Sequence, residues 1–147
     1  MVRESLWGFQ ILAAMHILAL VLSVGTLIWF DLRLLGFAMR RCRVSELYRQ
    51  LMPWTGAGFL VMCTTGGLLF SGSAASAYGN LAFRIKLSAI VLAGVNALVF
   101  HLITERTIAQ WDATPQPPLA ARLAGLTSIV LWVSIVVAGR MMSYTLY

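Results

Sequence analysis

Two long stretches without a charged side chain constrain this chain more than any other feature. Residues 6–30 and residues 51–83 contain no Asp, Glu, Lys or Arg. Two further apolar segments follow, at about 87–104 and 123–139. A helix of about 20 apolar residues spans a bilayer, whereas the strands of a membrane barrel would appear as short segments of alternating hydropathy. The pattern therefore predicts four membrane-spanning helices.

The composition supports the same class of protein. Of the 147 residues, 60% are hydrophobic and 11% are charged, with a mean hydropathy of +0.84. So few charges could not cover the surface of a soluble domain. We expect helices at about 7–31, 52–72, 80–104 and 120–144, joined by short connections into an all-α up-down four-helix bundle that forms one domain over residues 1–147. The first span is too long for a cleaved signal peptide.

The basic residues indicate an orientation in the membrane. The first predicted connection and its flanks hold five arginines and the third holds two, whereas the second, SGSAASAYGN, holds no basic residue. The positive-inside rule places the first and third connections in the cytoplasm and both termini outside, in the inner membrane of a bacterium. The net charge of +6 fits contact with anionic lipid headgroups, so it requires no nucleic-acid partner.

The two histidines of the chain both fall inside predicted spans. Ionisable groups in a membrane are costly and usually have a function. The imidazoles of His16 and His101 could each bond a neighbouring helix, or ligate a metal or a haem iron. At about 1.5 Å per residue, His16 lies about 13 Å below the outer end of its helix and His101 about 30 Å along the third. This difference in depth excludes a shared ion or haem, so two ligands would serve two sites, one in each leaflet.

Small residues near both histidines permit either interpretation. Gly66 and Gly67 of the second predicted helix reach the level of His16, and an earlier glycine pair reaches that of His101. A flat macrocycle between helices needs neighbours without bulk, but closely packed membrane helices use the same small residues. The spacing leaves both alternatives open.

Four basic residues are candidates for binding the propionates of a haem. Arg84 and Lys86 lie near the outer end of the third predicted helix, Arg140 lies near that of the fourth, and Arg33 follows the first. Arginine can bind a carboxylate through two parallel hydrogen bonds. The alternative is that these side chains extend to the lipid headgroups.

Two segments carry a resemblance to known proteins. HILALVLSVGTLIWFDLRLLG (16–36), followed by FRIKLSAIVLAGVNALVFH (83–101), resembles the superfamily of four-helix bacterial membrane proteins that holds CopD-like domains and the HemJ type of protoporphyrinogen oxidase. That superfamily has a histidine in the first helix, an arginine at its cytoplasmic end and a Lys-Leu pair opening the third helix; His16, Arg33 and Lys86 match these positions. The resemblance implies that His16 ligates haem b and that Lys86 is a functional lysine in the same pocket.

The leading hypothesis from the sequence is a haem b-binding membrane cytochrome. It would hold two haems per chain, with His16 and His101 as iron ligands, and exchange electrons with an unidentified redox partner. The resemblance implies two alternatives, which are oxidation of protoporphyrinogen as in HemJ and copper transport as in CopD. A further alternative is a scaffold whose histidines bridge helices. We also expect a homo-oligomer, because helix faces rich in small residues pack well against neighbouring copies.

Overall fold

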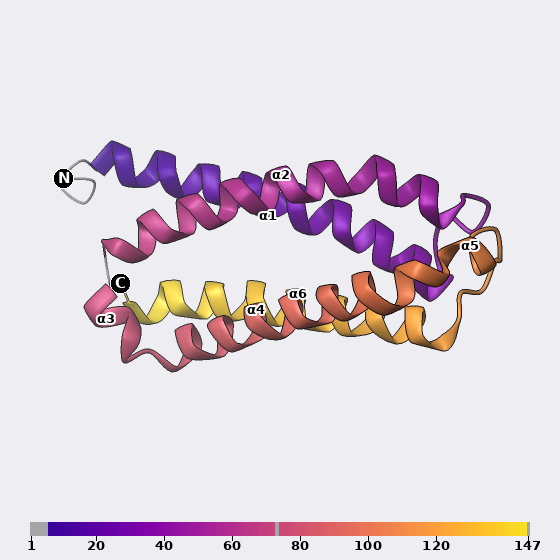
Figure 1. Ribbon diagram of the computed structural model, residues 1–147. Coiled ribbons are helices and arrows are strands. Elements are labelled where there is room, and N and C mark those ends of the chain that lie inside the picture. Colours follow the sequence, from indigo (N-terminus) through magenta and orange to yellow (C-terminus); the bar gives the residue numbers. More distant parts are fainter. Residues whose placement is uncertain (1–5, 73, 147) are drawn as a thin grey trace.

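The computed structural model describes residues 6–72 and 74–146, which form helices and no strand (Figure 1). Four long helices make up most of this part of the chain: α1 Leu6–Leu35, α2 Val44–Ser71, α4 Leu81–Val99 and α6 Leu119–Leu146. Each is long and apolar enough to cross a membrane, α4 together with the turns that continue it to Trp111. The protein is therefore a multi-pass membrane protein, and the predicted all-α four-helix fold is confirmed.

Short helical elements connect the long ones. Helix α3 (Ala74–Tyr78) lies between α2 and α4. After α4 the chain passes through a π-helical turn, η1 (Phe100–Thr104), a 3₁₀ turn, η2 (Glu105–Thr107), and a single helical turn, α5 (Ile108–Trp111). A π turn inserts an extra residue into a helix, and such turns occur frequently at functional sites.

The predicted start of the second helix was wrong by eight residues, because α2 begins at Val44 rather than at 52. Its first turns are amphipathic rather than uniformly apolar, so a search for uncharged runs passes over them. Val44 and Leu47 are buried in a core with Trp111 of α5, while charged side chains occupy the opposite face. Pro53 lies inside α2 without ending it.

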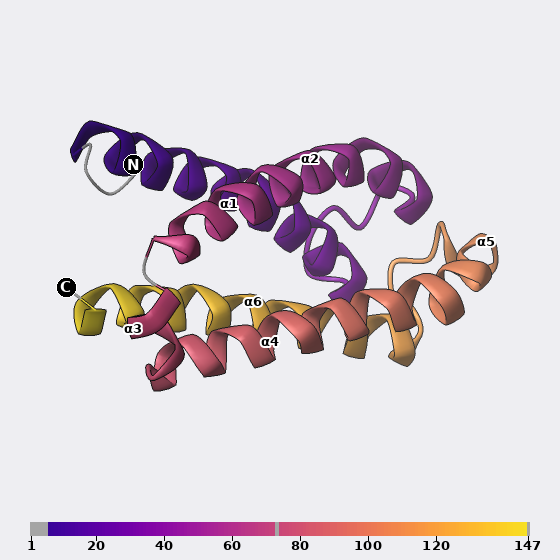
Figure 2. The ribbon, with the colours of Figure 1, turned by 60° about the vertical axis from the view of Figure 1, so that its left-hand side comes forward.

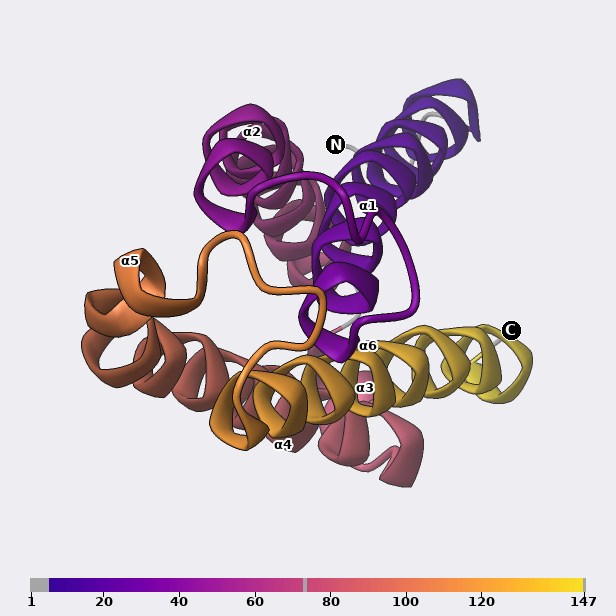
Figure 3. The same ribbon diagram turned by 90° about the vertical axis from the view of Figure 1, so that its right-hand side faces the viewer.

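The four long helices form two antiparallel pairs rather than a closed bundle. Helix α1 packs against α2, α4 packs against α6, and α1 also packs against α6. Helices α2 and α4 do not pack along their length, and the end-on view in Figure 3 shows them on either side of the opening between the pairs. Figure 2 shows the same separation from another side. The rings of Phe70 and Phe83 stack across it at one end, with centroids 5.1 Å apart.

Glycines allow the close approach of helices within this arrangement. A Cβ atom on Gly58 of α2 would lie 2.8 Å from the backbone nitrogen of Ser23 and 2.9 Å from the carbonyl oxygen of Ala19, both on α1. A Cβ atom on Gly125 of α6 would lie 3.0 Å from the carbonyl oxygen of Asp31. Helix α1 thus lies within backbone contact distance of α2 and α6. No such contact joins α2 to α4 along their length, so the opening lies between these two helices.

Candidate functional site

His16 is held in one orientation by α2. Its Nδ1 lies 2.9 Å from Oγ1 of Thr65. That hydroxyl has one proton, which it donates within α2 to the carbonyl oxygen of Val61 at 2.8 Å. The Thr65 oxygen therefore accepts a hydrogen bond from Nδ1–H, and the lone pair of the neutral imidazole is on Nε2. The backbone of Met62, one turn before Thr65 on α2, makes a further hydrogen bond with the imidazole.

Gly66 makes room for this imidazole, whereas Gly67 does not contact it. A Cβ atom on Gly66 would lie 3.0 Å from Cε1 of His16 and 3.6 Å from its Nδ1. A Cβ atom on Gly67 would meet no heavy atom of a described residue within 4 Å. The structure thus brings one of the two predicted glycines to His16.

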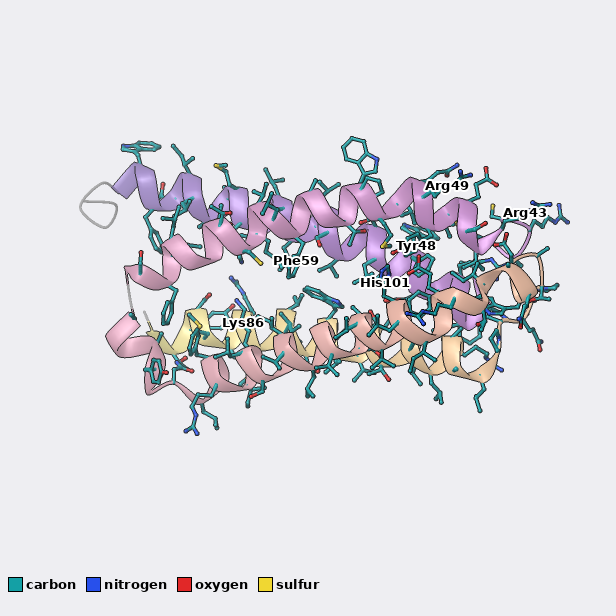
Figure 4. The ribbon with its side chains drawn as sticks, viewed as in Figure 1. Arg43, Tyr48, Arg49, Phe59, Lys86 and His101 are labelled. Carbon is teal, nitrogen blue, oxygen red and sulfur yellow. The ribbon has the colours of Figure 1, made fainter. Side chains whose placement is uncertain are left out.

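Lys86 of α4 extends into the space between the two helix pairs (Figure 4). Its Nζ lies 3.5 Å from the position of a Cβ atom on Gly139 of α6. It is close enough to His16 for the charge of its amine to act on the imidazole. Within the described chain it makes no hydrogen bond or ion pair. An unpaired amine at this depth in a membrane protein calls for an anionic partner.

The two other basic residues predicted near this site, Arg84 and Arg140, do not share the surroundings of Lys86. The side chain of Arg84 is exposed. Arg140 donates a hydrogen bond of 3.0 Å to the hydroxyl of Tyr144, and its guanidinium carbon lies 4.8 Å from the centroid of that ring. Both Arg140 contacts are within α6, so the structure does not bring this side chain to His16.

Arg33 joins two loops at the end of the bundle that holds Arg40, Arg41 and Arg43, which we call the arginine-rich end. The side chain of Arg33 is 0% exposed. Its Nε donates to the carbonyl oxygen of Cys42 at 2.9 Å, and one terminal nitrogen donates to that of Thr114 at 3.0 Å. Arg33 therefore holds the α1–α2 loop against the loop that precedes α6.

Asp112 makes a second connection at the arginine-rich end. Its carboxylate accepts hydrogen bonds of 2.7 Å from both the backbone N–H and the hydroxyl of Ser45, in the first turn of α2. Burial raises the pKa of Asp112, but the two hydrogen bonds from Ser45 and the charges of Arg43 and Arg33 outweigh burial and lower it below its ordinary value. The carboxylate is thus kept ionised at the start of α2, where negative charge is favourable.

A cavity of about 440 Å³ lies between the two helix pairs, closer to the arginine-rich end than His16. All four long helices contribute to its wall, and its volume falls in the range of small-molecule sites. Aromatic and small residues form most of the lining. The polar side chains in it are Ser23, Asp31, Tyr48, Thr55, Asn96, His101 and Ser128.

His101 lines this cavity from the π turn that follows α4 (Figure 4). Its Nδ1 pairs with the carboxylate of Glu105, one turn further on. The side chain is 60% exposed, because it faces the opening between α2 and α4. His16 does not line this cavity. No group of three or more His, Cys, Asp or Glu side chains able to hold a metal ion occurs in residues 6–72 and 74–146.

Asp31 is a polar residue of the cavity that the sequence analysis did not single out. It is 3% exposed, and its Oδ2 has no hydrogen-bond partner in the described structure. Ser128 of α6 is the polar side chain that approaches this carboxylate. The sequence does contain a signal that could have identified Asp31. It is an acidic residue directly after an uncharged run of 25 residues, which places a carboxylate inside the first span.

Residues 8–145 match DUF6644, a family of unknown function. The chain belongs to this family. The matched range includes both histidines, Lys86 and Asp31. No curated protein and no solved structure matches the chain. For this DUF6644 protein, the resemblance to CopD and HemJ stays a prediction, and function must be argued from the side chains described above.

Proposed function

We propose that this protein binds haem b within the membrane and transfers electrons there. The observation that carries the proposal is the fixed imidazole of His16, whose Nδ1–H is bound by Thr65, so that the lone pair of the neutral ring is on Nε2. Histidines that ligate metals commonly donate their other N–H in this way, which sets the tautomer and orients the ring. The haem would supply the one-electron redox chemistry.

The side chains around His16 suit a haem. Nε2 of His16 would bind the haem iron, and Gly66 keeps bulk away from the imidazole. The unpaired amine of Lys86 would bind a propionate, since ammonium groups form strong hydrogen bonds with carboxylates. Such an anion would stabilise the charged form of the Lys86 amine in the membrane.

The surroundings of His101 suit a haem less well. The acidic side chains placed there are those of Asp31 and Glu105, and no described Lys or Arg lines the cavity to bind the two propionates of a haem. Arg33, one of the four residues predicted to bind haem propionates, is bonded to the loops instead. The second haem on His101 stays a prediction from the sequence.

An optical spectrum of the purified protein, taken oxidised and reduced after expression with adequate haem supply, tests the proposal. We expect a Soret band and a haem content near one per chain. A folded protein that is colourless would contradict the proposal and favour a scaffold. Copper without iron in elemental analysis would favour transport, and restored haem synthesis in a strain that lacks protoporphyrinogen oxidase would favour that enzyme.

The two neighbouring glycines provide a matched pair of variants for the same spectrum. We expect Gly66→Ala to lower the haem content, because the new methyl group would press on Cε1 of His16 at 3.0 Å. Gly67→Ala should leave the haem content unchanged, because its methyl group meets no described atom within 4 Å. Equal spectra for both variants would show that the position of the His16 ring does not matter for binding.

We also propose that the arginine-rich end faces the cytoplasm of a bacterium, with both termini outside. The exposed side chains of Arg40, Arg41 and Arg43 support this orientation. Cys42 lies in the same loop, and both Cys42 and Cys63 are free thiols. A membrane-impermeant maleimide should label Cys42 in inverted vesicles but not from the outer side of intact inner membranes. Cys42→Ser should remove the label, and labelling from the outer side would reverse the orientation.

A further inference from the structure

Two side chains that line the cavity between the helix pairs have an acceptor atom without a described hydrogen-bond partner. Asp31 presents a buried carboxylate oxygen without a described partner, and His101 has its Nδ1 paired with Glu105, which leaves Nε2. Two other polar groups of the lining are occupied. Ser23 donates to the carbonyl oxygen of Thr55 at 3.1 Å, and the amide of Asn96 donates to that of Ala124 at 3.0 Å.

Both Asp31 and His101 accept hydrogen bonds. A carboxylate is an acceptor, and an imidazole whose Nδ1 proton is directed at Glu105 has its lone pair on Nε2. A buried acceptor without a partner, such as Oδ2 of Asp31, is unfavourable. A ligand that places hydroxyl groups against Asp31 and His101 would remove that cost. The cavity therefore calls for a molecule that donates hydrogen bonds.

The rest of the lining calls for an aromatic molecule. The rings of Phe30 and Phe100 meet edge to face, with centroids 5.8 Å apart and planes at 83°. Those of Phe59 and Trp132 do the same at 6.4 Å and 88°. All four residues line the cavity. Aromatic side chains favour a further ring in stacked or edge-to-face contact.

Small residues leave room for such a ring where the cavity opens. Gly56 of α2 and Gly94 and Ala97 of α4 line the cavity and are exposed. They lie along the two helices that do not pack against each other. In a membrane this opening faces lipid, so an apolar tail can remain in the bilayer while the polar ring enters.

We propose that this cavity binds a lipid-soluble hydroquinone, with one hydroxyl donating to Asp31 and the other to His101. The ring would lie among the aromatic side chains, and the tail would leave between α2 and α4. Among the described residues, the lining holds no Lys or Arg that could pair with the carboxylates of a haem. The site shares no residue with the haem site proposed at His16, so either proposal can fail without the other.

Binding of a decyl-substituted 1,4-benzohydroquinone to the purified protein, kept anaerobic, tests the proposal. The reference probe is the same molecule with both hydroxyls methylated, which keeps the ring and tail but donates no hydrogen bond. Quenching of tryptophan fluorescence reports binding, since Trp132 lines the cavity. We expect the hydroquinone to bind at least about tenfold more tightly, as two hydrogen bonds to otherwise unpaired acceptors imply. Equal affinity would overturn the proposal.

Three variants locate the binding. Asp31→Asn should weaken hydroquinone binding about tenfold, because the acceptor becomes a neutral amide oxygen, which forms a weaker hydrogen bond than a carboxylate does. Glu46→Gln makes the same chemical change at an exposed carboxylate outside the cavity and should have no effect. His16→Ala should lose haem yet retain hydroquinone binding. Unchanged binding in Asp31→Asn would contradict the proposal.

Photo-crosslinking of the wild-type protein gives an answer even if Asp31→Asn fails to fold. An azido-benzoquinone with the same tail, reduced before irradiation, should label peptides of α1 and α4 that line the cavity. Labels confined to other surfaces would overturn the proposal. So would two haems per chain with the second lost in His101→Ala, because that haem would occupy the cavity. If a second copy of the chain covered the opening, it would block the labelling, and that result would also overturn the proposal.

Discussion

Replacing His16 with alanine should remove the Soret band of the purified protein while leaving the fold intact. The substitution deletes the nitrogen that we propose as the iron ligand, and the site loses one hydrogen bond to Thr65. Met15→Ala is the matched control, because Met15 is the adjacent, exposed residue on α1. The measurement is haem per chain by the pyridine haemochrome method, with the helical content followed by circular dichroism. Haem retained in His16→Ala would exclude His16 as the ligand.

The orientation of the imidazole can be tested apart from its presence. Thr65→Val keeps the shape of the side chain but removes the oxygen that accepts from Nδ1–H. We expect haem affinity to fall by about 10–100-fold, as is typical when the partner of a ligating histidine is lost. Thr64→Val is the control, because the Thr64 hydroxyl is exposed and bonds the carbonyl oxygen of Leu60 in its own helix. An equal effect of both variants would indicate a general weakening of α2.

Replacing Arg33 with methionine should lower the free energy of unfolding more than any of the other substitutions described above. Methionine fills part of the volume but leaves the carbonyl oxygens of Cys42 and Thr114 without their donor. Buried groups that lose their partner cost about 1–3 kcal/mol each, so the expected loss is about 2–6 kcal/mol. Thermal unfolding in detergent, followed by circular dichroism, measures the effect.

A matched control separates this role from charge alone. Arg41→Met removes the same charge from the same end of the bundle, but the Arg41 side chain is exposed. We expect its unfolding temperature to stay close to that of the wild type. If Arg33→Met were as stable as Arg41→Met, the two bonds to loop carbonyls would have no structural importance.

The number and position of the spans could be predicted from the sequence because membrane helices are defined by uncharged length. The absence of charge over residues 6–30 and 51–83 was sufficient for two of them. The same criterion misplaced the start of α2, since Val44 and Leu47 alternate there with charged residues. Amphipathic turns at the end of a span depend on packing, which hydropathy does not measure.

Which helices pack together could not be predicted in the same way. A span that is apolar on every side gives no indication of the face that meets another helix. The pairing follows from contacts such as that of Gly58 with Ser23, which depend on backbone geometry. Only part of the candidate site could be predicted from the sequence. His16 and Lys86 are conspicuous among apolar residues, whereas the importance of Asp31 depends on the cavity beside it.

The two helix pairs are held together by stronger contacts at one end than at the other, and this difference affects how they can move relative to each other. At the arginine-rich end, Arg33 and the contact of Gly125 with α1 tie the pairs together through buried polar and backbone contacts. At the other end, two stacked rings, Phe70 and Phe83, bridge α2 and α4. A stack of rings separates and re-forms at little cost compared with buried hydrogen bonds. The two helix pairs can therefore rotate relative to each other about the contacts near Arg33, and such a rotation would change the distance between His16 on α1 and Lys86 on α4.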